Sequence, residues 1–152
     1  MKQIYSLALL FLTIVNSTFA QVNNSPGTWT PIGNVTLTNV TNDGDNGDGI
    51  GDGAVSVVGQ SAVVGQGAAY TFAGTMQSGQ AIAVSTYTYN VNSSFVKFTV
   101  NLYNKTDNTV LKTSQTISLL GNNVTPENTI LTYTAVASDN GDELQVRYIR
   151  VD

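Results

Sequence analysis

The stretch FVKFTVNLY, Phe95 to Tyr103, alternates between apolar and polar side chains from Val96 onward. Successive side chains of a β-strand point to opposite faces of a sheet, so this alternation predicts a strand with one buried and one outward face. The apolar face is predicted to pack in a core and comprises Val96, Phe98, Val100 and Leu102. The outward face is polar and comprises Lys97, Thr99, Asn101 and Tyr103.

The residues beyond this strand predict antiparallel neighbours. Lys105–Asn108 is a polar turn that leads into a second strand-forming run, and Asn140-Gly141 has the residue types of a tight hairpin. Near the C-terminus the alternation returns, with Gln145 and Arg147 on an outward face that offers hydrogen-bond donors. The apolar side of that run comprises Leu144, Val146 and Tyr148.

Short runs rich in Val, Thr, Tyr and Phe recur over the rest of the chain between clusters of Gly, Asn and Asp. No amphipathic helical pattern competes with them. This spacing predicts an all-β fold, a two-sheet antiparallel β-sandwich of about nine strands. The strands are expected at 35–40, 54–58, 61–64, 69–76, 81–89, 95–103, 110–119, 129–137 and 144–151.

The N-terminal residues have the pattern of a secretory signal peptide. A basic Lys2 precedes an apolar run from Leu7 to Val15, and small residues follow at Thr18 and Ala20. The apolar run is shorter than the ~20 residues that a transmembrane helix needs. We therefore expect cleavage after Ala20 and a secreted or extracellular protein, free or associated with the cell surface, with no transmembrane segment.

The domain boundaries follow from this leader. Residues 1–20 are predicted as signal peptide, 21–28 as a linker or N-terminal arm, and 29–152 as one β-sandwich domain. The chain stops directly after its last expected strand, so the domain is expected to be the N-terminal part of a longer protein. The style of the leader and the Asn- and Thr-rich composition indicate a bacterial source.

Composition excludes several classes of function. The chain has a net charge of −4, only six Lys and Arg residues, no Cys and no His. Dispersed basic residues argue against nucleic-acid binding, which needs clustered positive charge against phosphates. The absence of His and Cys removes the usual general base, the usual nucleophile pairs and the common zinc ligands. A fold without disulfides must be held by its core or by bound ions.

Carboxylates provide no convincing catalytic pair. Asp142 and Glu143 are the obvious candidates for a glycosidase mechanism, which needs two carboxyl groups about one substrate. Adjacent residues at the start of a strand point to opposite faces and do not readily share a substrate. We therefore predict that these residues form no enzyme by themselves, although the domain is expected to be part of a larger secreted enzyme or surface protein.

The densest polar feature is NDGDNGDGIGDG, residues 42–53, an acidic loop rich in glycine. Calcium binds six to eight oxygens, and carboxylates alternating with glycines suit such a shell. The match to an EF-hand loop is imperfect because Ala54 stands where the bidentate glutamate belongs. A calcium-stabilised loop and a solvated acidic hairpin therefore both remain open. The candidate ligands are Asp43, Asp45, Asp48 and Asp52.

Aromatic side chains are the second candidate site. Sugar rings stack on aromatic faces while neighbouring polar groups bind the hydroxyls. Tyr70 and Tyr148 alternate with apolar residues, which indicates packing in or beside the core. Tyr103 lies instead on the polar face of its strand and is the preferred candidate. The predicted ligand-binding residues are Tyr103, Asn101, Lys97, Arg147 and Trp29.

The order of these features resembles that of the galactose-binding-like jelly rolls, which serve as carbohydrate-binding modules of secreted bacterial enzymes that degrade polysaccharides. The resemblance covers about Trp29 to Asp152. It implies a structural calcium at the Asp run and a glycan site that includes Tyr103, Asn101 and Arg147. It rests on Trp29 and on the segments GAVSVVG (53–59), GQGAAYTFAGTMQ (65–77), FVKFTVNLYNKTDNTVLKTSQTISL (95–119) and GDELQVRYIRVD (141–152).

Two functions remain in competition. The first is a secreted, non-catalytic carbohydrate-binding module, stabilised by calcium, whose partner is a polysaccharide or other glycan. The chain has a single tryptophan and so departs from the paired aromatic platforms common in such modules. A flat crystalline polysaccharide is therefore not the expected ligand. The second is a structural or adhesive cell-surface β-sandwich that mediates protein contacts, since edge strands and polar sheet faces suit that role equally.

Overall fold

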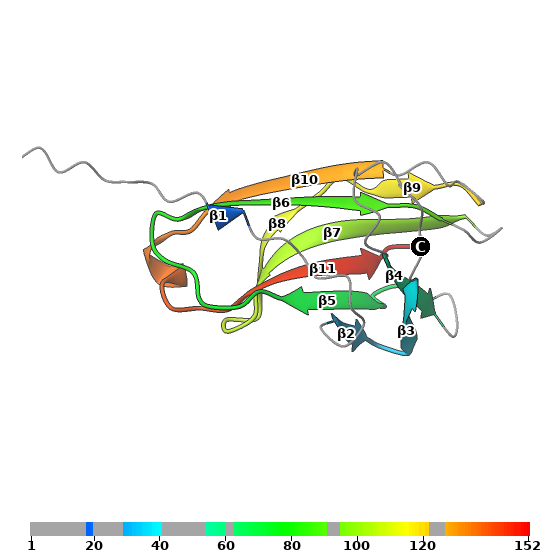
Figure 1. Ribbon diagram of the computed structural model, residues 1–152, viewed down its shortest axis with the longest axis horizontal. Coiled ribbons are helices and arrows are strands. Elements are labelled where there is room, and N and C mark those ends of the chain that lie inside the picture. The colour runs from blue at the N-terminus through cyan, green and yellow to red at the C-terminus, as the bar shows by residue number, and fades with distance from the viewer. Residues whose placement is uncertain (1–17, 20–28, 41–53, 60–62, 91–94, 122–126) are drawn as a thin grey trace, which may run out of the picture.

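The computed structural model describes residues 18–19, 29–40, 54–59, 63–90, 95–121 and 127–152, which are drawn as ribbon in Figure 1. No helix in these ranges is long and apolar enough to cross a membrane. A short 3₁₀ helix at Ala137–Asp139 accompanies the strands. The strands are β1 (Thr18–Phe19), β2 (Trp29–Ile32), β3 (Val35–Val40), β4 (Ala54–Gly59), β5 (Gly67–Thr71), β6 (Ala81–Thr88), β7 (Val96–Asn104), β8 (Thr109–Thr113), β9 (Ile117–Leu119), β10 (Glu127–Thr134) and β11 (Leu144–Arg150).

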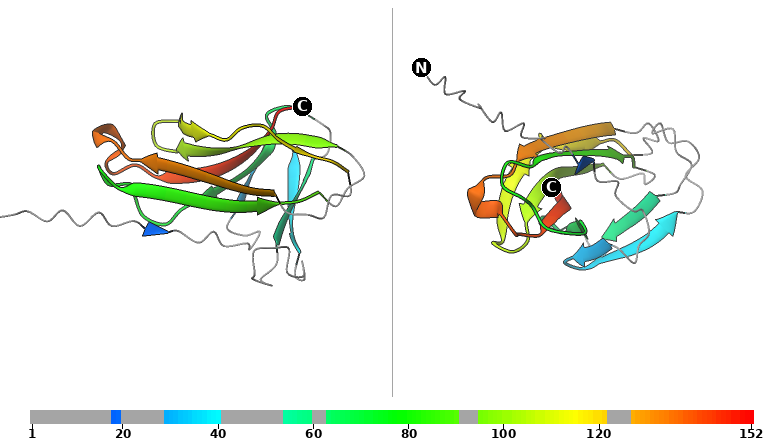
Figure 2. Two further views of the ribbon diagram at one scale, coloured as in Figure 1. Left: turned by 90° about the horizontal axis from the view of Figure 1, so that it is seen from above. Right: turned by 60° about the vertical axis from the view of Figure 1, so that its left-hand side comes forward.

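Two sheets face each other (Figure 2). The larger sheet has the order β2-β5-β11-β7-β8, with β9 also paired to β7, and all its pairs are antiparallel. The smaller sheet has the order β1-β6-β10, in which β6 and β10 are antiparallel and β1 is parallel to β6. β3 and β4 form a separate antiparallel pair near β2 and β5. The predicted all-β sandwich is confirmed.

Strand β7 buries the face that its alternation predicts to be apolar and inward. Val100 and Leu102 are 0% exposed and Phe98 is 9% exposed, while Val96 is partly buried against the same core. Burying a Val, Leu or Phe side chain stabilises a fold by ~1.5 to 3 kcal/mol. The inward side chains of β7 therefore stabilise the larger sheet against the core. The other inward residues of the core cluster are Phe72, Met76, Ile82, Val84, Leu119, Leu131, Ala135, Leu144 and Val146.

Gly67 allows β5 and β11 to approach closely. A Cβ atom at this position would overlap the carbonyl oxygen of Tyr148, whose strand is hydrogen bonded to β5. The contact is with backbone, which cannot swing away as a flexible side chain could. The sheet therefore requires glycine at residue 67.

Strand boundaries differ from the predictions at several places. The run 69–76 ends as a strand at Thr71, because the chain turns through Gly74, whose φ is +85°. The run 110–119 divides into β8 and β9, where the Ser114 hydroxyl accepts a hydrogen bond from the Val100 amide at 3.0 Å. Val63 and Val64 lie outside any strand, whereas Ser61 and Ala62 lie outside the described residues. β1 and β2 were not among the predicted strands.

The predicted hairpin at Asn140-Gly141 is wrong. β10 pairs with β6 and β11 pairs with β5 and β7, so the connection carries the chain from one sheet to the other. Asp139 explains the local structure, because its buried carboxylate accepts hydrogen bonds from the Tyr133 hydroxyl at 2.6 Å and the Val136 amide at 2.8 Å. These bonds hold the short 3₁₀ turn. The other predicted turn, Lys105–Asn108, does join the antiparallel strands β7 and β8.

Candidate functional site

The outward face of the larger sheet carries polar side chains in two adjacent rows. In one row Tyr103 of β7 lies opposite Gln145 of β11, which lies opposite Thr71 of β5. In the next row Asn101 lies opposite Arg147. Directly opposed residues share a face, and residues two apart along a strand do so as well. Both rows therefore lie on the face away from the buried Val100, Leu102 and Val146.

Arg147 is the centre of this site. Its guanidinium carbon lies 3.2 Å from the centroid of the Tyr103 ring, a cation–π stack. Its Nε donates a hydrogen bond of 2.8 Å to Oε1 of Gln145. Both contacts hold the guanidinium in one orientation over the sheet. One face of the Tyr103 ring is thereby covered, and the tyrosine hydroxyl makes a long contact of 3.5 Å to Oδ1 of Asn108.

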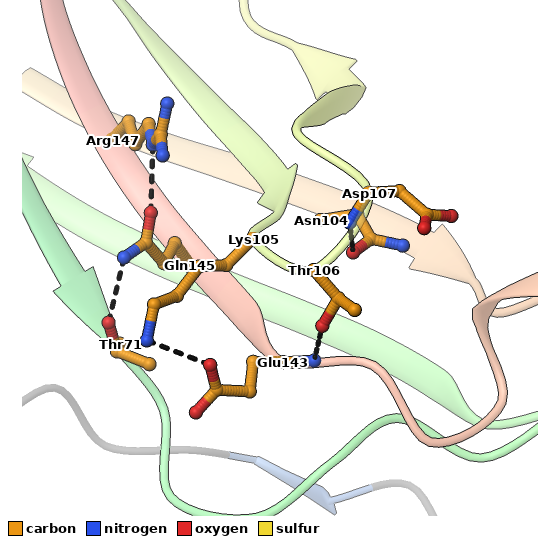
Figure 3. Close-up of polar contacts among 8 residues, drawn as sticks. All are labelled: Thr71, Asn104, Lys105, Thr106, Asp107, Glu143, Gln145 and Arg147. Atoms are coloured by element: carbon orange, nitrogen blue, oxygen red, sulfur yellow. Dashed lines mark hydrogen bonds and ion pairs between the residues drawn. The ribbon is translucent and has the colours of Figure 1, made fainter.

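Gln145 connects Arg147 to the neighbouring strand. Its Nε2 donates to Oγ1 of Thr71 at 2.8 Å, so the hydrogen bonds run from Arg147 through Gln145 to β5 (Figure 3). Gln145 is only 6% exposed, and its amide is satisfied on both sides. A polar network of this kind fixes its members before any ligand arrives.

Asn101 lies opposite Arg147 and has a buried acceptor atom that receives no hydrogen bond within the described residues. The side chain is 9% exposed, and within the described residues its Oδ1 has no hydrogen-bond donor. A buried acceptor without a donor costs about 1–3 kcal/mol. The site therefore has one polar atom whose partner the described part of the chain does not supply.

The β7–β8 turn closes one end of the two rows. Lys105 forms an ion pair of 2.7 Å with Glu143, and the Glu143 amide donates to Oγ1 of Thr106 at 3.1 Å (Figure 3). Asp142 accepts a hydrogen bond of 2.7 Å from Nδ2 of Asn104, which is fully buried. The two candidate carboxylates thus have different partners, one a lysine and the other a buried amide.

The structure places the remaining predicted ligand residues elsewhere. Lys97 shares the outward face of β7, but it is six residues from Tyr103, roughly 20 Å along a strand. Its ammonium lies 5.4 Å from the centroid of the Phe95 ring. Trp29 lies opposite Tyr70 on the core side, 5.5 Å from the centroid of that ring and 5.7 Å from that of Tyr148. Of the five residues, Tyr103, Asn101 and Arg147 come together.

The candidate calcium ligands Asp43, Asp45, Asp48 and Asp52 lie outside the described residues. Among the residues that are described, no cluster of three or more acidic side chains could hold a metal ion.

Thr71 and Gln145 belong to the site but were not among the predicted ligand residues. The alternation around Val146 does place Gln145 and Arg147 on the same outward face, so that signal was present. Thr71 joins them only through the register of β5 against β11, which no local pattern encodes.

A hollow lies between the two sheets, apart from the polar rows. It has a volume of about 220 Å³, and its walls include Gln66, Phe98 and Tyr148. The Oε1 atom of Gln66 is buried without a hydrogen-bond donor within the described residues. The Tyr148 side chain is partly exposed, but burial around its hydroxyl raises the pKa to about 12, despite a hydrogen bond with Thr86 that acts in the opposite direction. This hollow has room for a few water molecules.

Comparisons with known proteins identify the fold. No family model matches the sequence, and no curated protein matches it. The structure is similar to the tandem CBM22-1–CBM22-2 domain of Xyn10C from Paenibacillus barcinonensis, with a TM-score of 0.56 and 14% identity over 84% of this chain and 39% of that one.

Two further solved structures are similar. One is the CBM22-1–GH10 part of endo-1,4-β-D-xylanase 10B from Clostridium thermocellum, complexed with xylohexaose, with a TM-score of 0.52 and 17% identity over 81% of this chain and 23% of that one. The other is the enzymatically active domain of tailspike protein 4 from bacteriophage CBA120, with a TM-score of 0.53 and 13% identity over 90% of this chain and 19% of that one. The likeness shows that the chain has a β-sandwich fold like that of the CBM22 carbohydrate-binding modules, and that it spans well under half of each matched chain.

Proposed function

We propose that the chain is a carbohydrate-binding module that holds a polysaccharide on the outward face of its larger sheet. The observation that carries this proposal is the fixed stack of Arg147 on Tyr103, oriented by Gln145 and Thr71. The similarity of the fold to CBM22 modules supports it, and one of the similar structures was solved with a xylo-oligosaccharide.

The site suits a sugar chain for physical reasons. Sugar rings have apolar C–H patches that pack on flat π systems, and their hydroxyls need hydrogen-bond partners. The Tyr103–Arg147 stack provides such a flat group, Asn101 provides an acceptor without a donor beside it, and Gln145 holds Arg147 in place. Because the network is already ordered, binding would require little additional loss of side-chain freedom.

The test is affinity electrophoresis of the full chain through gels that contain soluble polysaccharides, including xylan. We expect at least one polymer to slow the protein, and Tyr103→Ala to weaken that retardation by about tenfold, as for loss of a stacking contact of 1–2 kcal/mol. Tyr87→Ala is the matched control, because Tyr87 is 39% exposed on the smaller sheet. Uniform mobility across the panel would contradict the proposal and favour the structural or adhesive alternative.

The proposal includes secretion, with cleavage of the leader after Ala20. Cleavage there would remove β1, which pairs with β6 at Ile82 and Ala83, and would leave that edge of β6 without this partner. N-terminal sequencing of the protein recovered from the culture medium tests this step. A mature protein that begins at Met1 would contradict it.

The proposal also assigns a structural calcium ion to Asp43, Asp45, Asp48 and Asp52. Carboxylates on a glycine-rich loop are suitable calcium ligands. We expect excess EDTA to lower the melting temperature and added calcium to restore it, because an ion that binds only the folded state stabilises that state. An unchanged transition would mean that the loop holds no stabilising ion.

We further propose that the module is non-catalytic and acts beside a catalytic domain of a longer protein. The ion pair and hydrogen bonds of Glu143 and Asp142 support the first statement, since they tie both carboxylates to structural partners. Release of reducing sugar from a bound polymer by the purified chain, and its loss in Glu143→Gln, would contradict it.

A further inference from the structure

Within the described residues the guanidinium of Arg147 has no acidic partner, unlike the cationic groups of Lys105 and Arg150. Lys105 pairs with Glu143 at 2.7 Å and Arg150 pairs with Asp152 at 3.6 Å. Within the described residues Arg147 has no carboxylate within 4.0 Å, although its side chain is partly buried and held by two contacts. A cation that is partly removed from water costs free energy unless an anion or hydrogen-bond acceptors compensate for it.

The contacts of Arg147 leave one edge of the guanidinium available. Nε is used by Gln145 and one face of the group lies on Tyr103, whereas the terminal nitrogens donate to no acceptor within the described part of the chain. Two parallel N–H groups on a planar guanidinium match the two oxygens of a carboxylate. Asn101, directly opposite on β7, adds a buried acceptor that needs a donor such as a sugar hydroxyl.

We infer that this site binds an acidic polysaccharide and that Arg147 recognises the carboxylate of a uronic acid residue. The inference rests on the proposed function and specifies its ligand class. The carboxylate would lie against the terminal nitrogens of Arg147, while the sugar ring packs beside Tyr103. Glu143 does not oppose this, because Lys105 neutralises it.

The inference can be tested on the unaltered chain. Polygalacturonate and its methyl-esterified form share a backbone and differ in free carboxylates, and glucuronoxylan can be compared with its carboxyl-reduced form. We expect at least one acid form to bind roughly 10- to 100-fold more tightly than its neutral counterpart, as for a charge-assisted hydrogen-bonded pair. Added salt should reduce the difference.

Variants assign that difference to one side chain. Arg147→Gln should bring the acidic and neutral forms to similar affinity, and Arg147→Lys should weaken acid binding because it keeps the charge but loses the planar fork. Lys112→Gln, an exposed position on β8, removes the same charge and should leave the preference intact. Thermal unfolding of each variant identifies any loss caused by misfolding.

The outcomes separate this inference from the proposed function. Equal or tighter binding of the neutral forms would overturn the uronate inference and leave polysaccharide binding in place. Equal binding of dextran sulfate would show a response to charge rather than to carboxylates, and would also overturn it. Binding to no polymer of the panel would overturn both.

Discussion

Tyr133→Phe removes a single hydroxyl group from the link between the two sheets. That hydroxyl donates to Oδ2 of Asp139 at 2.6 Å, and Asp139 is only 4% exposed. In the variant the carboxylate keeps its hydrogen bond from the Val136 amide at 2.8 Å but loses the shorter one. The ring itself remains, so its packing against the core is preserved.

The expected loss of stability follows from the charge of the acceptor. A hydrogen bond to an ionised group contributes about 1.5–3 kcal/mol. With a urea m-value of about 1–3 kcal/mol per molar, the unfolding midpoint should fall by about 1 M. Tyr87→Phe is the control, because that hydroxyl belongs to an exposed side chain and its removal should leave the midpoint nearly unchanged.

The effect should depend on pH in the alkaline range. The hydrogen bond to Asp139, together with desolvation and the negative charge of that carboxylate, raises the pKa of Tyr133 from 10.0 to about 12. Because folding raises this pKa, the interaction of the neutral hydroxyl stabilises the protein fully below pH 10. This contribution to stability is lost as the pH rises through 12. The difference between the wild type and Tyr133→Phe should therefore be constant near neutral pH and shrink between pH 10 and 12.

Urea unfolding monitored by tryptophan fluorescence at pH 7, 9, 10.5 and 11.5 measures this difference. Asp139→Asn and the double variant complete a cycle that isolates the coupling of the two side chains. Equal midpoints for the wild type and Tyr133→Phe at pH 7 would refute the reasoning. So would a difference that stays the same up to pH 11.5.

Three further outcomes follow from the packing and the polar network. Leu102→Ala should destabilise the fold by about 2–5 kcal/mol in urea unfolding, because Leu102 is 0% exposed; a loss below 1 kcal/mol would argue against its place in the core. Gly67→Ala should lower the melting temperature sharply, since its methyl group would overlap the Tyr148 carbonyl, and a melting temperature equal to that of the wild type would contradict the close approach of β5 and β11. Thr71→Val should leave the fold intact but weaken polysaccharide retardation, because Gln145 loses the acceptor that orients it; unchanged retardation would show that Gln145 needs no such support.

Local alternation was sufficient to predict β7, β11 and much of the core. β7 and β11 each carry a pattern with a period of two, and their apolar faces are the ones that pack inward. The same pattern placed Tyr103, Asn101 and Arg147 outward. The site could be predicted to that extent because a strand's two faces are encoded within the strand itself.

Relations between strands could not be predicted in the same way. The opposition of Asn101 to Arg147, and of Gln145 to Thr71, depends on register across segments far apart in the chain. The aromatic ring of Trp29 makes it a candidate ligand residue in the sequence, but its pairing with Tyr70 directs it to the core side. Asn140-Gly141 has the residue types of a hairpin, yet the connection carries the chain from one sheet to the other. The same residue types suit both kinds of turn, and only the pairing of the flanking strands distinguishes them.

The position of β11 has a consequence for how the chain folds during synthesis. β11 lies between β5 and β7, although it follows both of them in the sequence. Until Leu144–Arg150 leaves the ribosome, β5 and β7 each have an unpaired edge in the middle of the future sheet. Unpaired edges are templates for association with other chains, and long-range pairing of this type is slow. The larger sheet must therefore close late, and the nascent chain depends on being kept apart from its neighbours until its last strand arrives.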